Sequence, residues 1–244
     1  MTTVDLGTAW QDIRARMMQV ALPDSRFDMD LDSFIPAFTG VDTASRSAAG
    51  QSPFIRAKRL FITPDNSMQE LRHLALAAGK TVLIPTYGLK RGFLKLDPAR
   101  FDPALALYAS WGDGGEHFGT FVPIPELPGI GRIDLCLVGA AAVTTSGLRF
   151  GMGHRYFDVE WNIFAAAGLV SDATPVWTVV HEAQVIEATN AGGLDEVPVD
   201  MTFTPDRTIA MPQAARPAVL RVDTLALLFG ATPPAAVVDA VRCA

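Results

Sequence analysis

The sequence predicts an α/β domain with a mostly parallel central sheet, and three observations support this prediction. Short apolar segments alternate with segments of helical periodicity along much of the chain. Tight connections join a strand, a helix and a second strand between residues 59 and 86, as in a βαβ unit with parallel strands. Residues 132–143 are almost entirely apolar, as expected of a strand covered on both faces. We therefore expect one α/β domain that spans residues 1–244.

The N-terminal part begins with a predicted amphipathic helix over residues 8–22. Its apolar side chains recur at spacings of three and four on one face: Trp10, Ile13, Met17 and Val20. Residues 23–51 are rich in Asp, Ser, Thr and Gly and have weak periodicity. We expect a long loop with short helical pieces there, and long loops in compact domains often carry function.

The βαβ unit follows, with strands predicted at residues 59–64 and 81–86. The helix between them begins with Ser67 three residues before Glu70, the spacing of a capping box. Gly79 is placed to end this helix in a left-handed turn.

The C-terminal half predicts a strand at 132–143, a helix at 158–169 that ends at Gly168, and a strand at 174–185. A hairpin is expected around Pro205 and Asp206, and a small helix at 232–243.

Composition excludes several classes of function. The chain is 49% hydrophobic and 19% charged, which is typical of a globular protein, and its net charge is −6. An acidic surface disfavours nucleic acid and anionic membranes as partners, and no apolar run approaches the roughly 18 residues of a membrane span. The first ten residues do not have the pattern of a secretory signal, so we expect a cytoplasmic protein. Composition and pattern do not indicate the oligomeric state.

A glycine-rich stretch carries the strongest chemical signal. Gly151 and Gly153 permit close backbone approach, so that successive N–H groups form an anion-binding nest at the start of a helix. An aspartate directly after such a loop suits Mg²⁺, which binds through one or two carboxylates plus phosphate. The cationic candidates for phosphate are Arg149, His154 and Arg155, and the aspartate is Asp158. The alternative is a tight turn followed by a helix that Asp158 caps.

Two further polar pairs follow predicted strands. Lys90 and Arg91 form either a phosphate or carboxylate clamp or a solvated basic turn. His181, followed by Glu182, is either a general base or a hydrogen-bonded structural residue.

Several of these segments together resemble the 5-formyltetrahydrofolate cyclo-ligase (methenyltetrahydrofolate synthetase) family over about residues 60–209. They are "ALAAGKTVLIPT", "IDLCLVGAAAVTTSGLRFGMGHRYFD", "TPVWTVVHEAQV" and "VPVDMTFTP". The segments "GKTVLIPTYGLKRGFLKLDP" and "FDVEWNIFAAAGL" resemble its divergent branch of methenyltetrahydrofolate synthetase domain-containing proteins. The resemblance implies a three-layer α/β/α fold like that of ribose-5-phosphate isomerases and CoA transferases. It also implies ATP and Mg²⁺ as cofactors and a folate-like small molecule as substrate.

The resemblance also assigns roles to residues. The family loop G-x-G-(K/G)-G-(Y/F)-(Y/F)-D, which cradles nucleotide phosphates, matches residues 151–158. ATP contacts are expected from Arg14 and Arg149 and from the loop itself: Gly151, Met152, Gly153, His154, Arg155, Tyr156, Phe157 and Asp158. Asp158 is the expected Mg²⁺ ligand, and Lys90 and Arg155 are the expected catalytic residues. Tyr156 is also a candidate wall for the folate or the adenine ring.

The chain departs from the family at three places. His154 and Arg155 replace residues that are usually lysine or glycine, and the N-terminal helix offers arginine without lysine. Pro64 stands where the family has a folate-contacting glutamate, which leaves Asp65 as the nearest carboxylate and Ser67 at the threonine position.

The sequence is therefore compatible with three functions. The first is ATP-dependent cyclisation of 5-formyltetrahydrofolate to 5,10-methenyltetrahydrofolate. The second is action on another ATP-activated or phosphorylated small molecule, and the third is a non-catalytic nucleotide-binding module.

Overall fold

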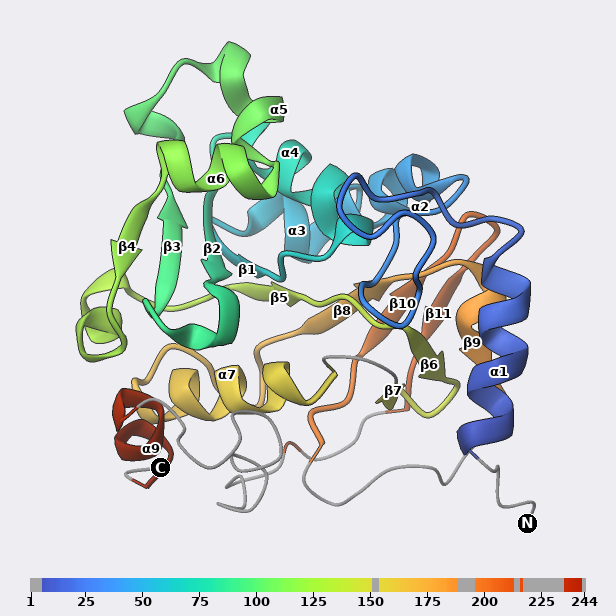
Figure 1. Cartoon of the computed structure of the whole chain (residues 1–244). Helices are drawn as coiled ribbons and strands as arrows, with labels where there is room; N and C mark the ends of the chain where they lie inside the picture. Colours follow the sequence, from blue (N-terminus) through green and yellow to red (C-terminus); the bar gives the residue numbers. More distant parts are fainter. Residues whose placement is uncertain (1–5, 151–153, 188–195, 213–215, 217–234, 243–244) are drawn as a thin grey trace.

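The computed structural model describes residues 6–150, 154–187, 196–212, 216 and 235–242, and in this part of the chain helices cover both faces of a central sheet (Figure 1). The sheet has eight strands. In spatial order they are β11 (Thr208–Ala210), β10 (Met201–Phe203), β8 (Val176–Val179), β5 (Leu135–Leu137), β1 (Arg59–Ile62), β2 (Thr81–Pro85), β3 (Phe93–Leu96) and β4 (Thr120–Val122).

The middle of the sheet is parallel and its edges are antiparallel. Strands β10, β8, β5, β1 and β2 pair in parallel, whereas β11, β3 and β4 join antiparallel. The two strands of the expected βαβ unit are neighbours, with Leu60 opposite Val82. The predicted mostly parallel sheet and the C-terminal hairpin are thus confirmed.

Helices form the two outer layers (Figure 1). One face carries α2 (Val41–Ala49), α3 (Ser52–Arg56) and α4 (Gln69–Ala77), with α5 (Ala106–Ala109) and α6 (Gly112–Phe118) beyond them. The other face carries α7 (His154–Ala166) and α9 (Ala235–Arg242). This arrangement confirms the three-layer α/β/α fold.

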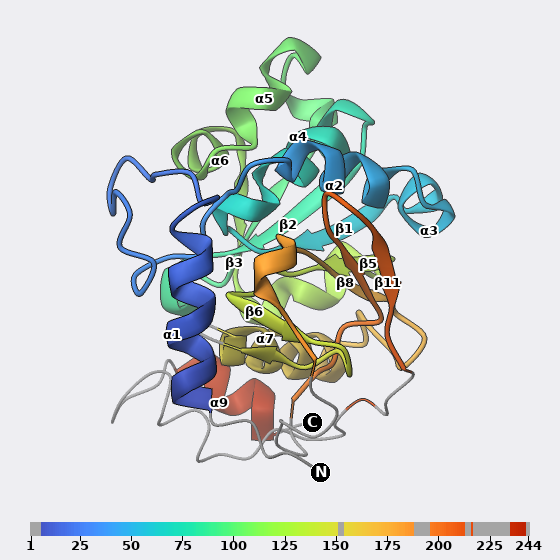
Figure 2. The same cartoon turned by 90° about the vertical axis from the view of Figure 1, so that its right-hand side faces the viewer.

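A second, three-stranded sheet lies at one end of the molecule, with the order β7 (Arg149–Phe150), β6 (Ala142–Thr144) and β9 (Val185–Ile186). The N-terminal helix α1 (Leu6–Met17) stands beside it in both views (Figure 2). Ile13 and Met17 of α1 are buried, as the predicted apolar face requires.

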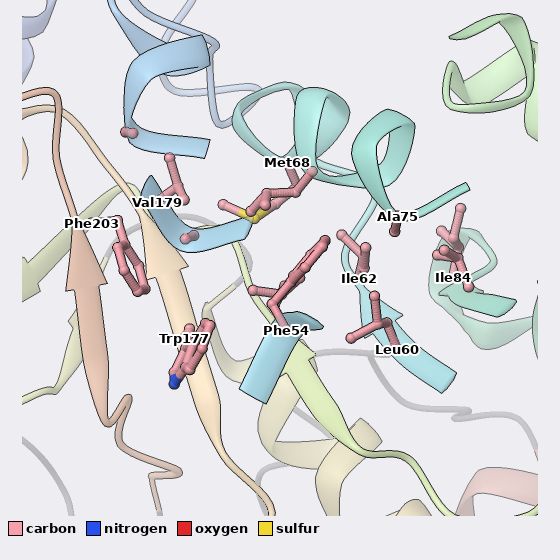
Figure 3. Packing of buried hydrophobic residues seen from close by; sticks show 14 of the residues in the cluster. Phe54, Leu60, Ile62, Met68, Ala75, Ile84, Trp177, Val179 and Phe203 are labelled. Atoms are coloured by element: carbon pink, nitrogen blue, oxygen red, sulfur yellow. The ribbon is translucent and has the colours of Figure 1, made fainter. Parts of the chain in front are cut away.

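The core lies on both sides of the central sheet because its strands are apolar on both faces. Leu60 and Ile62 of β1 pack with α2 and α4, whereas Phe61 between them packs on the face of α7. Figure 3 shows the cluster on the face of α2 and α4, which includes Met68 and Phe54. In this cluster the ring centroids of Trp177 and Phe203 lie 5.2 Å apart. Burying one such side chain contributes roughly 1.5–3 kcal/mol, so these clusters are a major source of stability.

The predicted capping box at Ser67 is wrong. The chain already turns at Asn66–Met68 as a 3₁₀ turn, and α4 begins at Gln69 with no side-chain cap. Ser67 is buried, and its hydroxyl oxygen has no hydrogen-bond partner among the described residues. Because the first turn is closed by the Met68 N–H donating to the Asp65 carbonyl, Ser67 is already inside the turn. Gly79 does end the helix with a positive φ of 73°.

The helix predicted from Asp158 begins four residues earlier, at His154. Asp158 therefore lies in the second turn and is not an N-cap. The reason is tertiary: its carboxylate is buried and is held by side chains and backbone outside the helix.

The apolar segment 132–143 forms two strands in two sheets, not one strand. The chain leaves the central sheet after β5 and enters the small sheet at β6. Between them, Gln184 Nε2 donates to the carbonyl oxygens of Ala140 and Ala141, and Gly139 N–H donates to Thr63 Oγ1. Apolar composition alone does not reveal this change of partner.

His181 has a structural role: its Nδ1 accepts a hydrogen bond from Ala183 N–H at 3.1 Å and caps the turn Glu182–Gln184. None of the helices in the described ranges combines the length and apolar character that a membrane span needs.

Candidate functional site

A cavity of about 170 Å³ lies at the carboxyl ends of the parallel strands β1, β2 and β5. Ligands in open parallel sheets bind at this edge. The end of β2 and the segments that follow the three strands contribute Thr63, Pro64, Asp65, Pro85, Thr86 and Gly139. The turn Tyr87–Leu89, Arg149 of β7 and three residues of α7, namely Tyr156, Phe157 and Glu160, complete the wall together with Ile35.

Asp65 is fixed at the end of β1 by a chain of hydrogen bonds. Gly139 N–H donates to Thr63 Oγ1 at 2.8 Å, and this hydroxyl donates to Asp65 Oδ2 at 2.6 Å. The buried Arg72 donates to the carbonyl oxygens of Thr63 and Asp65 at 2.6 and 3.0 Å. Burial raises the pKa of Asp65, and the hydrogen bond from Thr63 opposes this shift. Burial also lowers the pKa of Arg72 to about 10.

Gly139 is required by its close approach to Asp65. A Cβ at this position would lie 2.1 Å from Asp65 Oδ2. We expect Gly139→Ala to displace the carboxyl and to lower the free energy of unfolding by roughly 1–3 kcal/mol, as overpacking does. Urea denaturation measures this, with Gly129→Ala as control because a Cβ there meets nothing within 4 Å. Equal midpoints for the two variants would contradict the crowding.

Arg149 and Asp158 form a buried ion pair behind the cavity. Arg149 Nη2 donates to Asp158 Oδ1 at 3.0 Å, and both side chains are almost completely buried. The same oxygen accepts Val197 N–H at 2.9 Å, so Asp158 ties α7 to the segment before β10. Burial raises the pKa of Asp158, whereas Arg149 opposes that shift. The guanidinium of Arg149 also lies 4.9 Å from the ring centroid of Phe157.

Arg155 is half-buried at the start of α7. It donates from Nη1 to Glu196 Oε1 at 3.1 Å, and its Nε lies 3.6 Å from Asp158 Oδ2. Arg155 therefore adds a second cation beside Asp158, next to the position expected for phosphate.

The structure brings together only part of the predicted site. Arg149, Asp65, Tyr156 and Phe157 line one cavity, and Asp158 lies behind it. Gly151, Met152 and Gly153 lie outside the described residues, and His154 is the first residue of α7.

Three predicted residues lie apart from the cavity wall. Lys90 is exposed beside the rim, with its Nζ 5.8 Å from the ring centroid of Tyr87. Arg14 of α1 forms an ion pair with Asp32, with 3.3 Å between Nε and Oδ2. Ser67 is buried but does not line the cavity.

Sequence reasoning missed Glu160. Its side chain is 3% exposed, lines the cavity and leaves Oε2 without a hydrogen-bond partner among the described residues. Burial, followed by the charges of Asp65 and Asp158, raises its pKa to about 8. The sequence does contain one signal for it: Glu160 lies between the apolar residues Val159 and Trp161 in a predicted helix, and a carboxylate in such a place is unusual enough to indicate a special role.

Mg²⁺ can be tested against the donors that are present. The described residues contain no group of three or more His, Cys, Asp or Glu side chains that suits a metal. Asp158 Oδ2 accepts no hydrogen bond among them, so it offers one carboxylate oxygen. One carboxylate suits Mg²⁺ that takes its other ligands from phosphate and water. Arg155 beside this oxygen would have to turn toward the phosphates. The assignment of Mg²⁺ to Asp158 stays a prediction.

Comparison with known proteins identifies the family that this chain matches. The model of the 5-formyltetrahydrofolate cyclo-ligase family matches residues 10–205. The human methenyltetrahydrofolate synthase domain-containing protein is 32% identical over 214 residues, covering 84% of this chain and 54% of the relative. The mouse protein of the same name is 34% identical over 210 residues, covering 83% and 55%. This chain thus spans about half the length of these curated relatives.

A solved structure has a similar fold. The Aquifex aeolicus 5,10-methenyltetrahydrofolate synthetase superposes with a TM-score of 0.51 at 13% identity, covering 88% of this chain and 96% of that one. From its sequence match, the chain belongs to the 5-formyltetrahydrofolate cyclo-ligase family.

Proposed function

We propose that the chain converts 5-formyltetrahydrofolate to 5,10-methenyltetrahydrofolate in a reaction that depends on ATP and Mg²⁺. The observation that carries this proposal is the cavity at the ends of β1, β2 and β5 in a chain of the cyclo-ligase family. The cavity brings a carboxyl, a buried arginine and an aromatic side chain together: Asp65, Arg149 and Tyr156.

ATP would supply the phosphoryl group that activates the formyl oxygen, and Mg²⁺ held at Asp158 would offset the charge of the phosphates. The protein contributes position and charge. Arg149 is fixed by Asp158 and faces the cavity, and Arg155 lies beside that aspartate. Lys90 at the rim and Arg14 on α1 are further cations for the nucleotide, once they leave their present positions. Positioning and charge neutralisation of this kind are the main sources of phosphoryl-transfer catalysis.

The aromatic wall supports a folate ring. Tyr156 and Phe157 line the cavity from α7, and Tyr87, which is 91% exposed, lies on its rim. Flat aromatic faces bind flat heterocycles by offset stacking. Pro64 and Pro85 add apolar contacts that exclude water from the same space.

A thermal-shift screen tests the proposed ligand class. We expect 5-formyltetrahydrofolate to raise the unfolding temperature more than equal concentrations of citrate or inorganic phosphate. Tyr156→Ala is expected to reduce this shift and Tyr108→Ala to keep it, because Tyr108 lies on α5 outside the cavity wall. Equal stabilisation by all three anions would count against a folate site.

One observation favours a second function. Arg155 stands where the family usually has glycine, and it is paired with Glu196 and Asp158 at the start of α7. This pairing suits a member that acts on another ATP-activated or phosphorylated molecule, or one that binds nucleotide without turnover. Nucleotide binding by a chain that forms no methenyltetrahydrofolate would favour this alternative.

A further inference from the structure

Glu160 is a buried carboxyl whose hydrogen bonding the described part of the protein leaves incomplete. Its side chain is 3% exposed, and no described residue donates to Oε2. A buried polar oxygen without a partner costs free energy, and such an atom in a native structure calls for an explanation. A ligand that donates a hydrogen bond to Oε2 removes this cost.

The position of Glu160 directs this unfilled acceptor toward a ligand. It follows Tyr156 by four residues on α7, so the two side chains share one helix face, and both line the cavity. Asp65 also lines it, but its carboxyl already accepts the Thr63 hydroxyl at 2.6 Å. Glu160 is thus the lining carboxyl with an oxygen that no described residue satisfies.

The charges around the cavity select the kind of group that fits beside Glu160. The charged side chains of its wall are Asp65, Glu160 and Arg149, and Arg149 is paired with Asp158. These two carboxyls and one paired cation disfavour a phosphate or carboxylate at this end, also while Glu160 keeps its proton, because Arg149 is already paired with Asp158. They favour N–H donors.

The remaining wall is suited to a flat ring. Phe157 and Tyr156 supply aromatic faces, and Ile35, Pro64 and Leu89 supply apolar contacts. A planar heterocycle that carries an N–H donor on one edge satisfies both the apolar wall and the unfilled oxygen.

We propose that Glu160 recognises the 2-amino-4-oxopyrimidine edge of the ligand by accepting a hydrogen bond from its 2-amino group, and that the ring is the pterin of the folate. This inference rests on the proposed function, and it makes Glu160 a specificity-determining residue. This chain has Pro64 at the position of the family's folate-contacting glutamate. Glu160 would supply a carboxyl to the folate cavity in its place. Guanine carries the same edge, so guanosine is the competing source.

Calorimetric titration tests this with 5-formyltetrahydrofolate and its 2-desamino analogue. We expect the wild-type chain to prefer the 2-amino ligand by about 10- to 100-fold, the range for a hydrogen bond to a charged or strongly polar group. In Glu160→Met, which is similar in length and has no strong acceptor, the preference is expected to fall below about 3-fold. Glu126→Met is the control, since Glu126 is exposed and lies outside the cavity wall.

A second variant distinguishes loss of the hydrogen bond from a folding defect. Thermal unfolding is recorded for each chain, and Glu160→Gln retains one acceptor oxygen on the same side-chain skeleton. We expect Glu160→Gln to keep a larger share of the preference than Glu160→Met. An unchanged preference in both folded variants overturns the role of Glu160 and leaves the proposed function standing.

The other outcomes separate the two proposals. If the wild-type chain binds no 5-formyltetrahydrofolate, the proposed function and the pterin both fail. A third outcome is that the chain binds guanosine but not the folate, and that the dissociation constant for guanosine rises in Glu160→Met. In that case Glu160 does recognise the 2-amino-4-oxopyrimidine edge, but the ligand is not a pterin.

Discussion

Replacing Asp158 by alanine is expected to lower the free energy of unfolding by about 3–5 kcal/mol, because removing one partner of a buried ion pair leaves the other charge buried without its close counter-ion. Arg149 is 2% exposed and would keep its charge beside an apolar side chain. Val197 N–H would also lose its acceptor, and with it a contact between α7 and the segment before β10.

Urea denaturation followed by circular dichroism measures this loss. Asp12→Ala is the matched control, because Asp12 is exposed on α1, and such surface changes usually alter stability by less than about 0.5 kcal/mol. If the midpoints of Asp158→Ala and the wild type coincide, the ion pair is not a source of stability.

This stability cost changes how a metal role for Asp158 is tested. From the sequence, Asp158→Ala is expected to abolish Mg-ATP binding while the fold survives. The structure adds a folding defect that would mask that result. Asp158→Asn retains the volume and one acceptor oxygen, so it separates loss of the metal from loss of the fold.

Glu160 is expected to make the protein less stable as the pH rises from about 5 to 8. Burial raises its pKa from the model-compound value of 4.5 to about 8 in the folded chain. Between these values the folded chain keeps a proton that the unfolded chain has released. Raising the pH therefore favours the unfolded chain, and the full effect is on the order of 3–5 kcal/mol.

Comparison of Glu160→Gln with the wild type isolates this effect. The glutamine resembles the protonated carboxyl and does not titrate, so the two chains are expected to have similar stability at pH 5. At pH 8.5 the variant is expected to be the more stable by several kcal/mol. The difference between the chains is used because the pKa values of Asp65 and Asp158 are also raised by burial, and both groups are the same in the two chains. A difference that does not change with pH would contradict the raised pKa.

The fold was predictable because it depends on local patterns. Alternation of apolar and helical segments predicted β1, α4, β2 and the C-terminal hairpin, and Gly79 ended its helix as expected. The start of α7 was not predictable, because Asp158 is placed by Arg149 and Val197, which lie 9 and 39 residues away. The single strand predicted at 132–143 is two strands in the structure, also because of contacts with distant residues. Thr63 and Gln184 hydrogen-bond to the backbone between β5 and β6.

The site was predictable only in part. The glycine-rich stretch indicated Arg149, and the resemblance to the family indicated Asp65 and Tyr156; all three line the cavity. Glu160 was not predicted because a single carboxylate on a helix has no motif. Its burial and its closeness to Asp65, Arg149 and Asp158 depend on how α7 packs in the folded chain. The resemblance to the family implied a catalytic role for Lys90, but Lys90 follows the Tyr87–Leu89 turn and is exposed.

The central claim is that this cavity carries out ATP-dependent cyclisation of a folate, and turnover tests it most directly. Methenyltetrahydrofolate is followed by its absorbance with purified protein, 5-formyltetrahydrofolate and Mg-ATP, beside a reaction without ATP and one with Asp158→Asn. Product is expected to form only with ATP and to be lost in Asp158→Asn. Binding of both ligands to the wild-type chain without any product would contradict it.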